Sequence, residues 1–181
     1  MTLTKTGLEG CFIIEPWVFY DERGLFFESY QKEKLEKAMG FRVNFVQDNQ
    51  STSNRGVLRG LHFQKGEDAQ AKLVHVVKGE VLDVIVDLRK NSRSFGQHIK
   101  IVLSDEDQKS IFIPKGMAHG FLVRGEEAIF AYKCDAYYKR EAESGIVYND
   151  PTLGIDWGIP EAEVVLSEKD AALPLFKTLY P

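Results

Sequence analysis

Short runs of β-branched and aromatic residues, separated by turn residues, fill the chain from about residue 10 to about residue 140. Examples are GCFIIEPWVFYD, FRVNFVQDNQS, AKLVHVVKGEVLDVIVDLR and QHIKIVLSDEDQ. Runs of this length and spacing are typical of an all-β sandwich or barrel. The pattern therefore predicts an all-β, jelly-roll barrel of antiparallel strands with a few short peripheral helices.

Two pairs of runs have the pattern of β-hairpins. The turn would lie at Lys78-Gly79 in LVHVVKGEVLDVIV and at Gly125 in FLVRGEEAIFAY, because glycine readily adopts the positive φ of such turns. One segment, Ser29–Gly40, predicts a short helix, since Ser29 can cap its start and Gly40 can end it.

After Tyr138 the chain becomes polar and rich in turn residues, such as Asn149-Asp150-Pro151 and Gly154. We expect a tail of loops and short helices, from about residue 141 to residue 181, that wraps the β core. A chain of 181 residues suits one domain, so the whole chain, 1–181, is expected to fold as a single unit with its core at about 10–140.

Composition narrows the class of function. The formal net charge of -4 argues against binding to nucleic acid or to an anionic membrane, because both need a basic surface. No apolar run approaches the roughly 18 to 20 residues of a membrane-spanning helix, and the first ten residues, MTLTKTGLEG, lack the hydrophobic region of a signal peptide. With only two cysteines, Cys11 and Cys134, far apart in the sequence, a cytoplasmic location is expected.

Histidine is the usual proton carrier near neutral pH, and the chain has four, His62, His75, His98 and His119. Histidines on a jelly roll suggest a metal-dependent cupin, whose ligands usually include two closely spaced histidines on one strand. Here the residues after His62 are Phe63 and Gln64, so no H-x-H pair is formed. We therefore expect no metal site; the alternative is a metal-dependent oxygenase or isomerase that uses His62, His75 and His119.

The candidates for proton transfer are spread over the chain. His62 and Lys72 lie on neighbouring strand-like segments and could project into one cavity. Tyr132 on a late strand and Asp170 in the tail add a phenol and a carboxylate. A histidine base, a carboxylate that orients it, an ammonium and a phenol together suit proton abstraction beside a carbonyl. For Lys72 the alternative is an exposed strand position, and for His119, in the sequence AHGF, it is a turn residue that caps backbone groups.

Five motifs, in this order, resemble the dTDP-4-dehydrorhamnose 3,5-epimerase family: RGVLRGLHFQ, QAKLVHVVKGEVLDVIVDLR, FGQH, IPKGMAHGF and LSEKD. The resemblance covers nearly the whole chain, and DERGLFFESY fits it too. It implies a cupin-like jelly roll that inverts carbons 3 and 5 of dTDP-4-dehydro-6-deoxy-D-glucose, without cofactor or metal, to give dTDP-4-dehydro-L-rhamnose. Both carbons flank the 4-keto group, so their hydrogens can leave as protons and the resulting enolate can be reprotonated on its other face.

The resemblance also implies catalytic roles. His62 matches the general base, and Asp170 matches the carboxylate that pairs with it. Tyr132 matches the general acid that returns a proton from the other face. Lys72 matches the cation near the keto oxygen, where it would stabilise the charge of the enolate.

Substrate contacts follow from the same resemblance. Arg59 matches a residue that binds the pyrophosphate, and Arg23 matches one that does so from a neighbouring subunit. Tyr138 matches the aromatic residue that stacks on thymine, opposite Phe26 of the partner. The resemblance therefore implies a homodimer in which each copy completes the site of the other. The further expected contacts are Glu28, Gln47, Asn49, His119, Glu143 and Lys169.

Two departures from the family pattern lie outside the predicted proton-transfer residues. His75 stands where the family often has arginine, and the loop KGEDAQ lacks a common proline.

Relatives that make antibiotic sugars keep the fold and epimerise one carbon, so a mono-epimerase of a related dTDP-4-keto-6-deoxy sugar is an alternative. Tyr132 favours the double epimerase. A third hypothesis is a non-catalytic jelly roll that binds sugar nucleotides through its arginines.

Overall fold

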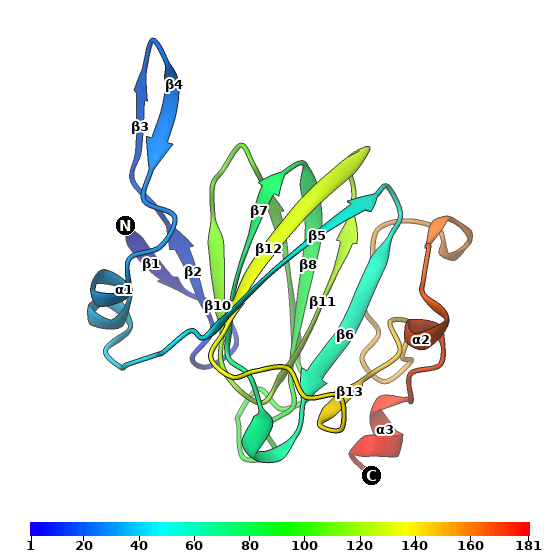
Figure 1. Cartoon of the computed structure of the whole chain (residues 1–181). Helices are drawn as coiled ribbons and strands as arrows, with labels where there is room; N and C mark the ends of the chain where they lie inside the picture. The colour runs from blue at the N-terminus through cyan, green and yellow to red at the C-terminus, as the bar shows by residue number, and fades with distance from the viewer.

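The structure, a computed structural model, describes all residues from Met1 to Pro181. Two sheets lie face to face and form the barrel (Figure 1). The strand order is β1-β2-β10-β7-β12-β5 in the six-stranded sheet and β13-β6-β11-β8-β9 in the five-stranded sheet. Every pairing within these sheets is antiparallel, which confirms the predicted all-β jelly roll.

The strands are between 3 and 8 residues long, in keeping with the short β-branched and aromatic runs of the sequence. The six-stranded sheet consists of β1 (Thr2–Lys5), β2 (Phe12–Glu15), β10 (Ser110–Ile113), β7 (Lys72–Lys78), β12 (Glu127–Cys134) and β5 (Gln47–Asn54). The five-stranded sheet consists of β13 (Glu143–Gly145), β6 (Leu58–Gln64), β11 (Met117–Val123), β8 (Glu80–Asp87) and β9 (His98–Ser104). The remaining elements are a hairpin of β3 (Val18–Asp21) and β4 (Gly24–Phe27), the helices α1 (Lys32–Met39), α2 (Glu168–Ala171) and α3 (Phe176–Leu179), and 3-10 turns at Gly66–Asp68 and Glu161–Glu163. No helix is both long enough and apolar enough to cross a membrane.

Neither of the two hairpins that the sequence predicts is formed. The strands β7 and β8 follow one another through Gly79, but β7 pairs with β10 and β12, whereas β8 pairs with β9 and β11. The strands β11 and β12 likewise belong to different sheets. Both strands of each pair direct apolar side chains into the same interior, so they face each other across it. Gly79 has the expected positive φ of 82°, but Gly125 has no positive φ.

A hydrophobic cluster fills the space between the two sheets. At its centre the rings of Phe121 on β11 and Phe130 on β12 stack with centroids 4.1 Å apart. Burial of each such side chain contributes about 1.5 to 3 kcal/mol. The buried members of this interior cluster are Leu8, Cys11, Val74, Val76, Val81, Ile85, Leu103, Ile111, Ile113, Met117, Phe121, Val123, Ala128 and Phe130.

The C-terminal tail lies against the outer face of the five-stranded sheet (Figure 1). Alternate residues of β8, such as Val84 and Val86, point away from the interior and pack with Ile155, Trp157 and Phe176 of the tail. The indole Nε1 of Trp157 donates a hydrogen bond to the carbonyl oxygen of Tyr148 (2.9 Å). This packing fixes the position of α2, which carries one of the expected site residues.

The helix α1 is shorter than the sequence predicts. It begins after Gln31, whose side-chain oxygen accepts from the amide of Lys34 (2.5 Å), so the expected cap Ser29 is wrong. The ring of Tyr30 packs edge-on against Phe45 with centroids 5.7 Å apart, and the chain becomes helical only beyond this contact. The predicted end is confirmed, because Gly40 adopts a φ of 81° and terminates the helix.

Two glycines bring β6 and β11 into close approach. Gly60 has a φ of 124°, and a Cβ at this position would lie 2.6 Å from the Cα of Gly120. A Cβ on Gly120 would lie 2.8 Å from the carbonyl oxygen of Arg59. Only glycine fits both positions. The approach sets His62 on β6 opposite His119 on β11 in the register of the sheet.

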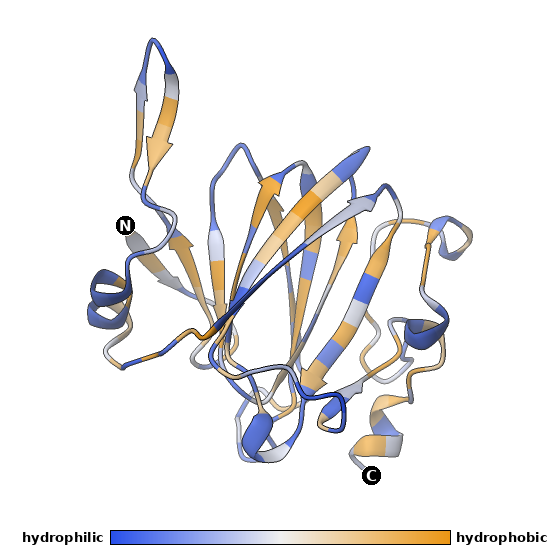
Figure 2. Cartoon of the chain, in the orientation of Figure 1, coloured by the Kyte–Doolittle hydropathy of each residue, from blue (hydrophilic) through white to orange (hydrophobic).

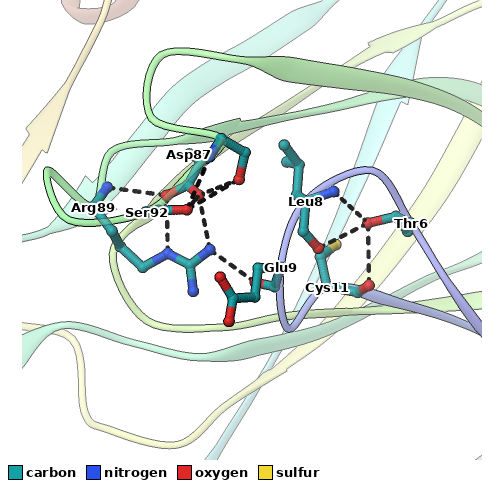
Figure 3. A network of polar contacts seen from close by, with 8 residues as sticks. Thr6, Leu8, Glu9, Cys11, Asp87, Arg89 and Ser92 are labelled. Carbon is teal, nitrogen blue, oxygen red and sulfur yellow. Dashed lines mark hydrogen bonds and ion pairs between the residues drawn. The ribbon is translucent and has the colours of Figure 1, made fainter.

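At the end of β8, Asp87 anchors the loop that leads to β9 (Figure 3). Its carboxylate accepts hydrogen bonds from the amide and Nε of Arg89 (3.0 and 2.9 Å) and from Nη2 of the same side chain (2.7 Å). The hydroxyls of Ser92 and Ser94 donate to it as well (2.5 and 2.7 Å). Burial alone would raise the pKa of Asp87, but these donors outweigh it and hold the pKa well below its usual value. Both oxygens are satisfied, so Asp87 acts as a structural anchor.

Candidate active site

Two adjoining cavities lie between the sheets. The first, with a volume of about 240 Å³, is lined by Tyr138 and Glu143 among others and is called here the Tyr138 cavity. The second, of about 320 Å³, is lined by Arg59 and His119 among others and is called the Arg59 cavity. Three residues line both cavities: His62, Lys72 and Tyr132. They mark the place where the two cavities meet.

His62 and Asp170 form a hydrogen-bonded pair. His62 lies on β6, Asp170 lies on α2, and Nε2 of the imidazole is 2.6 Å from Oδ1 of the carboxylate. Burial would raise the pKa of Asp170, but its bonds to His62, the Gly60 backbone and Ser167 lower it overall. An ionised Asp170 accepts the Nε2 proton of His62, which leaves the lone pair on Nδ1. The pair can therefore act as an oriented general base.

Lys72 and Tyr132 approach from the other sheet, on β7 and β12. The ammonium nitrogen of Lys72 lies 5.9 Å from the centroid of the Tyr132 ring. Burial lowers the pKa of Lys72 and raises the pKa of Tyr132. His62 lies on the five-stranded sheet and Tyr132 on the six-stranded sheet. A molecule held where the cavities meet would have the imidazole of His62 on one side and the phenol of Tyr132 on the other.

His119 forms a second pair of the same kind. Its Nε2 lies 2.7 Å from Oδ2 of Asp83, and its ring stacks on Phe130 with centroids 5.8 Å apart. The residue lies in the middle of β11 and not in a turn, so the alternative of a backbone-capping turn residue is wrong. Sequence reasoning missed Asp83, although a single carboxylate inside the apolar run VLDVIV is a visible signal.

Five of the expected substrate contacts are joined by hydrogen bonds around the Tyr138 cavity. Glu143 Oε2 accepts from the hydroxyl of Tyr138 (2.7 Å) and from Nζ of Lys169 (2.5 Å). Gln47 accepts from the amide of Tyr138 (2.9 Å) and donates to Asn49 (3.0 Å). The ring of Tyr138 is half exposed, so one face is free to stack on a planar ligand.

Arg59 lies at the open side of its cavity. Its Nε donates to the hydroxyl of Ser53 (3.1 Å), and the rest of the guanidinium is free of protein partners. Lys169 lines the same cavity. Two cations at one edge suit a phosphate-containing ligand, because guanidinium and ammonium groups bind phosphate oxygens through charge-assisted hydrogen bonds.

Three expected contacts line neither the Tyr138 cavity nor the Arg59 cavity of their own chain. Arg23 lies at the tip of the β3–β4 hairpin, where it pairs with Asp21 (2.5 Å) and exposes 86% of its side chain. Phe26 on the same hairpin is 71% exposed. Glu28 follows the hairpin and binds Lys34 (2.9 Å). Figure 1 shows the hairpin projecting away from the two sheets.

Of the three histidines in the metal-dependent alternative, His62 and His119 line the Arg59 cavity, but His75 does not. His75 lies on the face of β7 that points away from the interior, beside Asp48 and Lys133. No group of three or more His, Cys, Asp or Glu side chains is arranged to hold a metal ion. A metal site built from His62, His75 and His119 is therefore wrong for this fold, because His75 is on the opposite side of its strand.

Gln64 is a further residue that the expected contacts left out. Its Oε1 accepts from the amide of Lys139 (2.7 Å), and its Nε2 donates to the carbonyl oxygens of Asp68 (2.7 Å) and Tyr137 (3.2 Å). These bonds hold the loop that carries Tyr138. Its position two residues after His62 was the available signal, because alternate residues of a strand share a face.

Comparisons with known proteins connect the chain to one group of enzymes. Residues 5–178 match the family described as dTDP-4-dehydrorhamnose 3,5-epimerase. The enzyme of that name from Salmonella typhimurium is 50% identical over 175 residues, which are 97% of this chain and 95% of that protein. The crystal structure of the Elizabethkingia anophelis enzyme has a TM-score of 0.95 at 53% identity and covers 98% of this chain and 97% of its own. The dTDP-6-deoxy-D-glucose-3,5-epimerase of Legionella pneumophila, solved in complex with dTDP-4-keto-L-rhamnose, has a TM-score of 0.93 at 49% identity and covers 97% of this chain and 93% of its own.

Proposed function

Because the chain belongs to the dTDP-4-dehydrorhamnose 3,5-epimerase family, we propose how the residues of its two cavities carry out the reaction of that family. The enzyme inverts carbons 3 and 5 of dTDP-4-dehydro-6-deoxy-D-glucose and yields dTDP-4-dehydro-L-rhamnose for dTDP-L-rhamnose biosynthesis. The observation that carries the proposal is the opposed placement of His62 and Tyr132, on facing sheets, where the cavities meet.

Each inversion consists of two proton transfers. His62 removes the proton from carbon 3 or carbon 5, and the electron pair of the broken C–H bond moves into an enolate with the negative charge on the 4-oxygen. The ammonium of Lys72 stabilises that charge in the buried site. Tyr132 then returns a proton to the same carbon from the opposite face, and the carbonyl is restored. The electron pair never leaves the sugar, so we propose that no cofactor or metal takes part.

The nucleotide occupies the polar residues around this centre. Tyr138 stacks on the thymine, while Arg59 and Lys169 bind the diphosphate. Gln47, Asn49 and Glu143 line the Tyr138 cavity and supply hydrogen bonds to the ligand. His119 contacts the sugar from the Arg59 cavity. This assignment is supported by the match between these residues and the polar lining of the two cavities.

Deuterium exchange tests the reaction. When dTDP-4-dehydro-6-deoxy-D-glucose is incubated with the enzyme in heavy water, NMR is expected to show deuterium at both carbon 3 and carbon 5. His62 removes the original proton from each carbon, and the phenol of Tyr132, which exchanges with the solvent, delivers a deuteron in its place. Deuterium at carbon 3 alone would show that the enzyme is a mono-epimerase and not a double epimerase. The absence of deuterium at either carbon would overturn the function.

We also propose that two copies of the chain form a dimer and share their sites. The β3–β4 hairpin carries hydrophobic residues outside the core (Figure 2), of which Phe19, Tyr20 and Phe26 are 60%, 72% and 71% exposed. Exposed apolar residues that project from a fold in this way favour contact with another molecule. In a symmetric dimer the hairpin of each copy would bring Arg23 and Phe26 to the cavities of the other.

Mixing of two inactive variants tests the shared site. Arg23→Ala and His62→Ala proteins, unfolded together and reassembled, are expected to regain about one quarter of the wild-type activity, because random pairing leaves one intact site in each mixed dimer. A mixture of Arg59→Ala and His62→Ala proteins is the control, since both changes affect the same cavity, and it is expected to stay inactive. If the Arg23→Ala mixture also stays inactive, each copy uses its own residues only.

A cytoplasmic location is part of the proposal. Cys11 and Cys134 are free thiols, and both are buried. Burial raises the pKa of Cys11 to about 12 and that of Cys134 to about 11, so neither forms a reactive thiolate near neutral pH. Free thiols are typical of reducing compartments.

A further inference from the structure

Asp83 is a carboxylate in a place where a charge is costly. It lies in the middle of β8, its exposed fraction is 0%, and its neighbours on the inner face of that strand, Val81 and Ile85, belong to the interior cluster. Only one of its oxygens is satisfied: Oδ2 accepts from Nε2 of His119, whereas Oδ1 is buried without a hydrogen-bond partner. Buried carboxylates are normally paired and fully bonded, so Asp83 requires an explanation.

Asp87 shows what a structural aspartate looks like on the same strand. It is also 0% exposed, but both of its oxygens are bonded to Arg89 and to two serine hydroxyls. The incomplete bonding of Asp83 is therefore not a general property of β8. It is specific to Asp83, whose bonded partner His119 lines the Arg59 cavity.

The partner of Asp83 belongs to the reacting centre. His119 lines the Arg59 cavity together with His62, Lys72 and Tyr132, and it lies opposite His62 in the sheet register. Two imidazole–carboxylate pairs thus stand side by side on neighbouring strands, with Nε2 bonded to the carboxylate in both. In each pair the carboxylate fixes the ring, and Nδ1 is the nitrogen left for a ligand.

The positive charge of Lys72 needs a negative partner, and the unbonded oxygen of Asp83 can supply it. Lys72 forms no ion pair within 4.0 Å, and the pKa of its ammonium is lowered by burial, against which the negative charges of Asp83 and Glu143 act. Glu143 is already bonded to Lys169 and Tyr138. Lys72 lines the same cavity as His119, the bonded partner of Asp83. Because Oδ1 of Asp83 has no hydrogen-bond partner, Asp83 is the carboxylate whose charge remains available to Lys72.

We propose that Asp83 is a positioning residue of the active site, which holds the ring of His119 against the sugar and serves as the buried counter-charge of Lys72. The inference rests on the proposed function and assigns Asp83 to it. Asp83 does not touch the substrate. It acts through His119 and Lys72, which sit at the sugar and keep a positive charge next to the oxygen of the enolate.

The test compares Asp83→Asn with Asp87→Asn. In Asp83→Asn the amide oxygen can still accept from His119, but the side chain carries no charge. We expect kcat to fall roughly 10- to 100-fold, by analogy with carboxylates that orient metal-ligating histidines, and KM to change by less than about threefold. Asp87→Asn is expected to lower the thermal unfolding midpoint and to keep the wild-type kcat. The proposal would be overturned if Asp83→Asn keeps the wild-type kcat. It would also be overturned if the fall in kcat is no larger than the fraction of the Asp83→Asn protein that is unfolded.

The pH dependence of the activity distinguishes a positioning role of Asp83 from a purely structural role. The titratable and charged groups around Lys72 are Arg59, His62, Asp83, His119, Tyr132, Cys134, Tyr138, Glu143, Lys169 and Asp170. Lys72 acts as a cation, so activity is lost as the pH rises through its pKa. Removal of the negative charge at Asp83 lowers that pKa further, and this limb of the profile is expected to move to lower pH in Asp83→Asn. An unmoved limb would contradict the role of counter-charge.

A measurement on the unaltered protein covers the case in which Asp83→Asn fails to fold. Nitrogen-15 NMR of labelled histidines is expected to show His119 with its proton fixed on Nε2. A proton on Nδ1, or exchange between the two tautomers, would overturn the pairing. Turnover by the wild-type protein is measured alongside, because its absence would refute the proposed function, whereas the His119 tautomer tests Asp83 by itself.

Discussion

His62→Ala is expected to lower kcat by about 10⁴-fold, the upper end of what one general base contributes. The reason is that the same imidazole removes the protons of both carbons, and its pairing with Asp170 at 2.6 Å holds Nδ1 as the basic atom. Deuterium exchange in heavy water should disappear at carbon 3 and at carbon 5 together. The measurement is NMR of the substrate, run with turnover assays on the same protein.

His75→Ala is the matched control for this prediction. His75 is also a strand histidine, but it faces away from the interior of the barrel, so exchange at both carbons should be kept. Thermal unfolding of both variants is measured as well, because Asp170 loses its partner in His62→Ala. Retained exchange at either carbon in a folded His62→Ala protein would show that another group removes that proton.

Tyr132→Phe is expected to separate exchange from inversion. The phenol is the donor on the face opposite His62, and burial raises its pKa, so it carries its proton throughout the neutral range. Without it, His62 can still remove a proton and return a deuteron on the same face. Inversion should fall about 10²- to 10³-fold, while deuterium still enters the substrate. NMR distinguishes the two results, because the retained and the inverted sugar have different couplings.

Tyr137→Phe serves as the control, since Tyr137 is a neighbouring tyrosine that is 67% exposed and lines neither cavity. It should invert both carbons at the wild-type rate. If Tyr132→Phe inverts as fast as the wild type, another acid supplies the second proton. If it loses exchange and inversion equally, Tyr132 acts at the abstraction step.

The strand pattern and the family motifs predicted the fold class, the enzyme family and the reaction. Alternation of apolar and polar residues depends on local geometry, because side chains of a strand point to opposite faces in turn. In the structure this alternation puts Lys72 on the inner face of β7 and His75 on the outer face. The residue roles taken from the family remain predictions for the experiments above.

Alternation alone could not predict the strand partners. In VVKGEV the turn at Gly79 was visible, but a turn of this kind suits a hairpin and a connection between two sheets equally well. The predicted start of α1 was wrong for a related reason. Ser29 is a good cap by residue type, but Tyr30 packs against Phe45 and the helix begins two residues further on, at Lys32. In both cases the deciding contact lies outside the local sequence.

By itself the sequence determined the all-β class and the types of side chain available for proton transfer. It also supplied the glycines on β6 and β11 that let these two strands approach each other closely. Tertiary structure alone decided which of them meet. His62 reaches Asp170 across 108 positions of the chain, and Asp83 reaches His119 across 36. The physical reason is that a strand's pattern specifies which face is buried, whereas the packing of two sheets determines which strand lies opposite and which buried charge finds a partner.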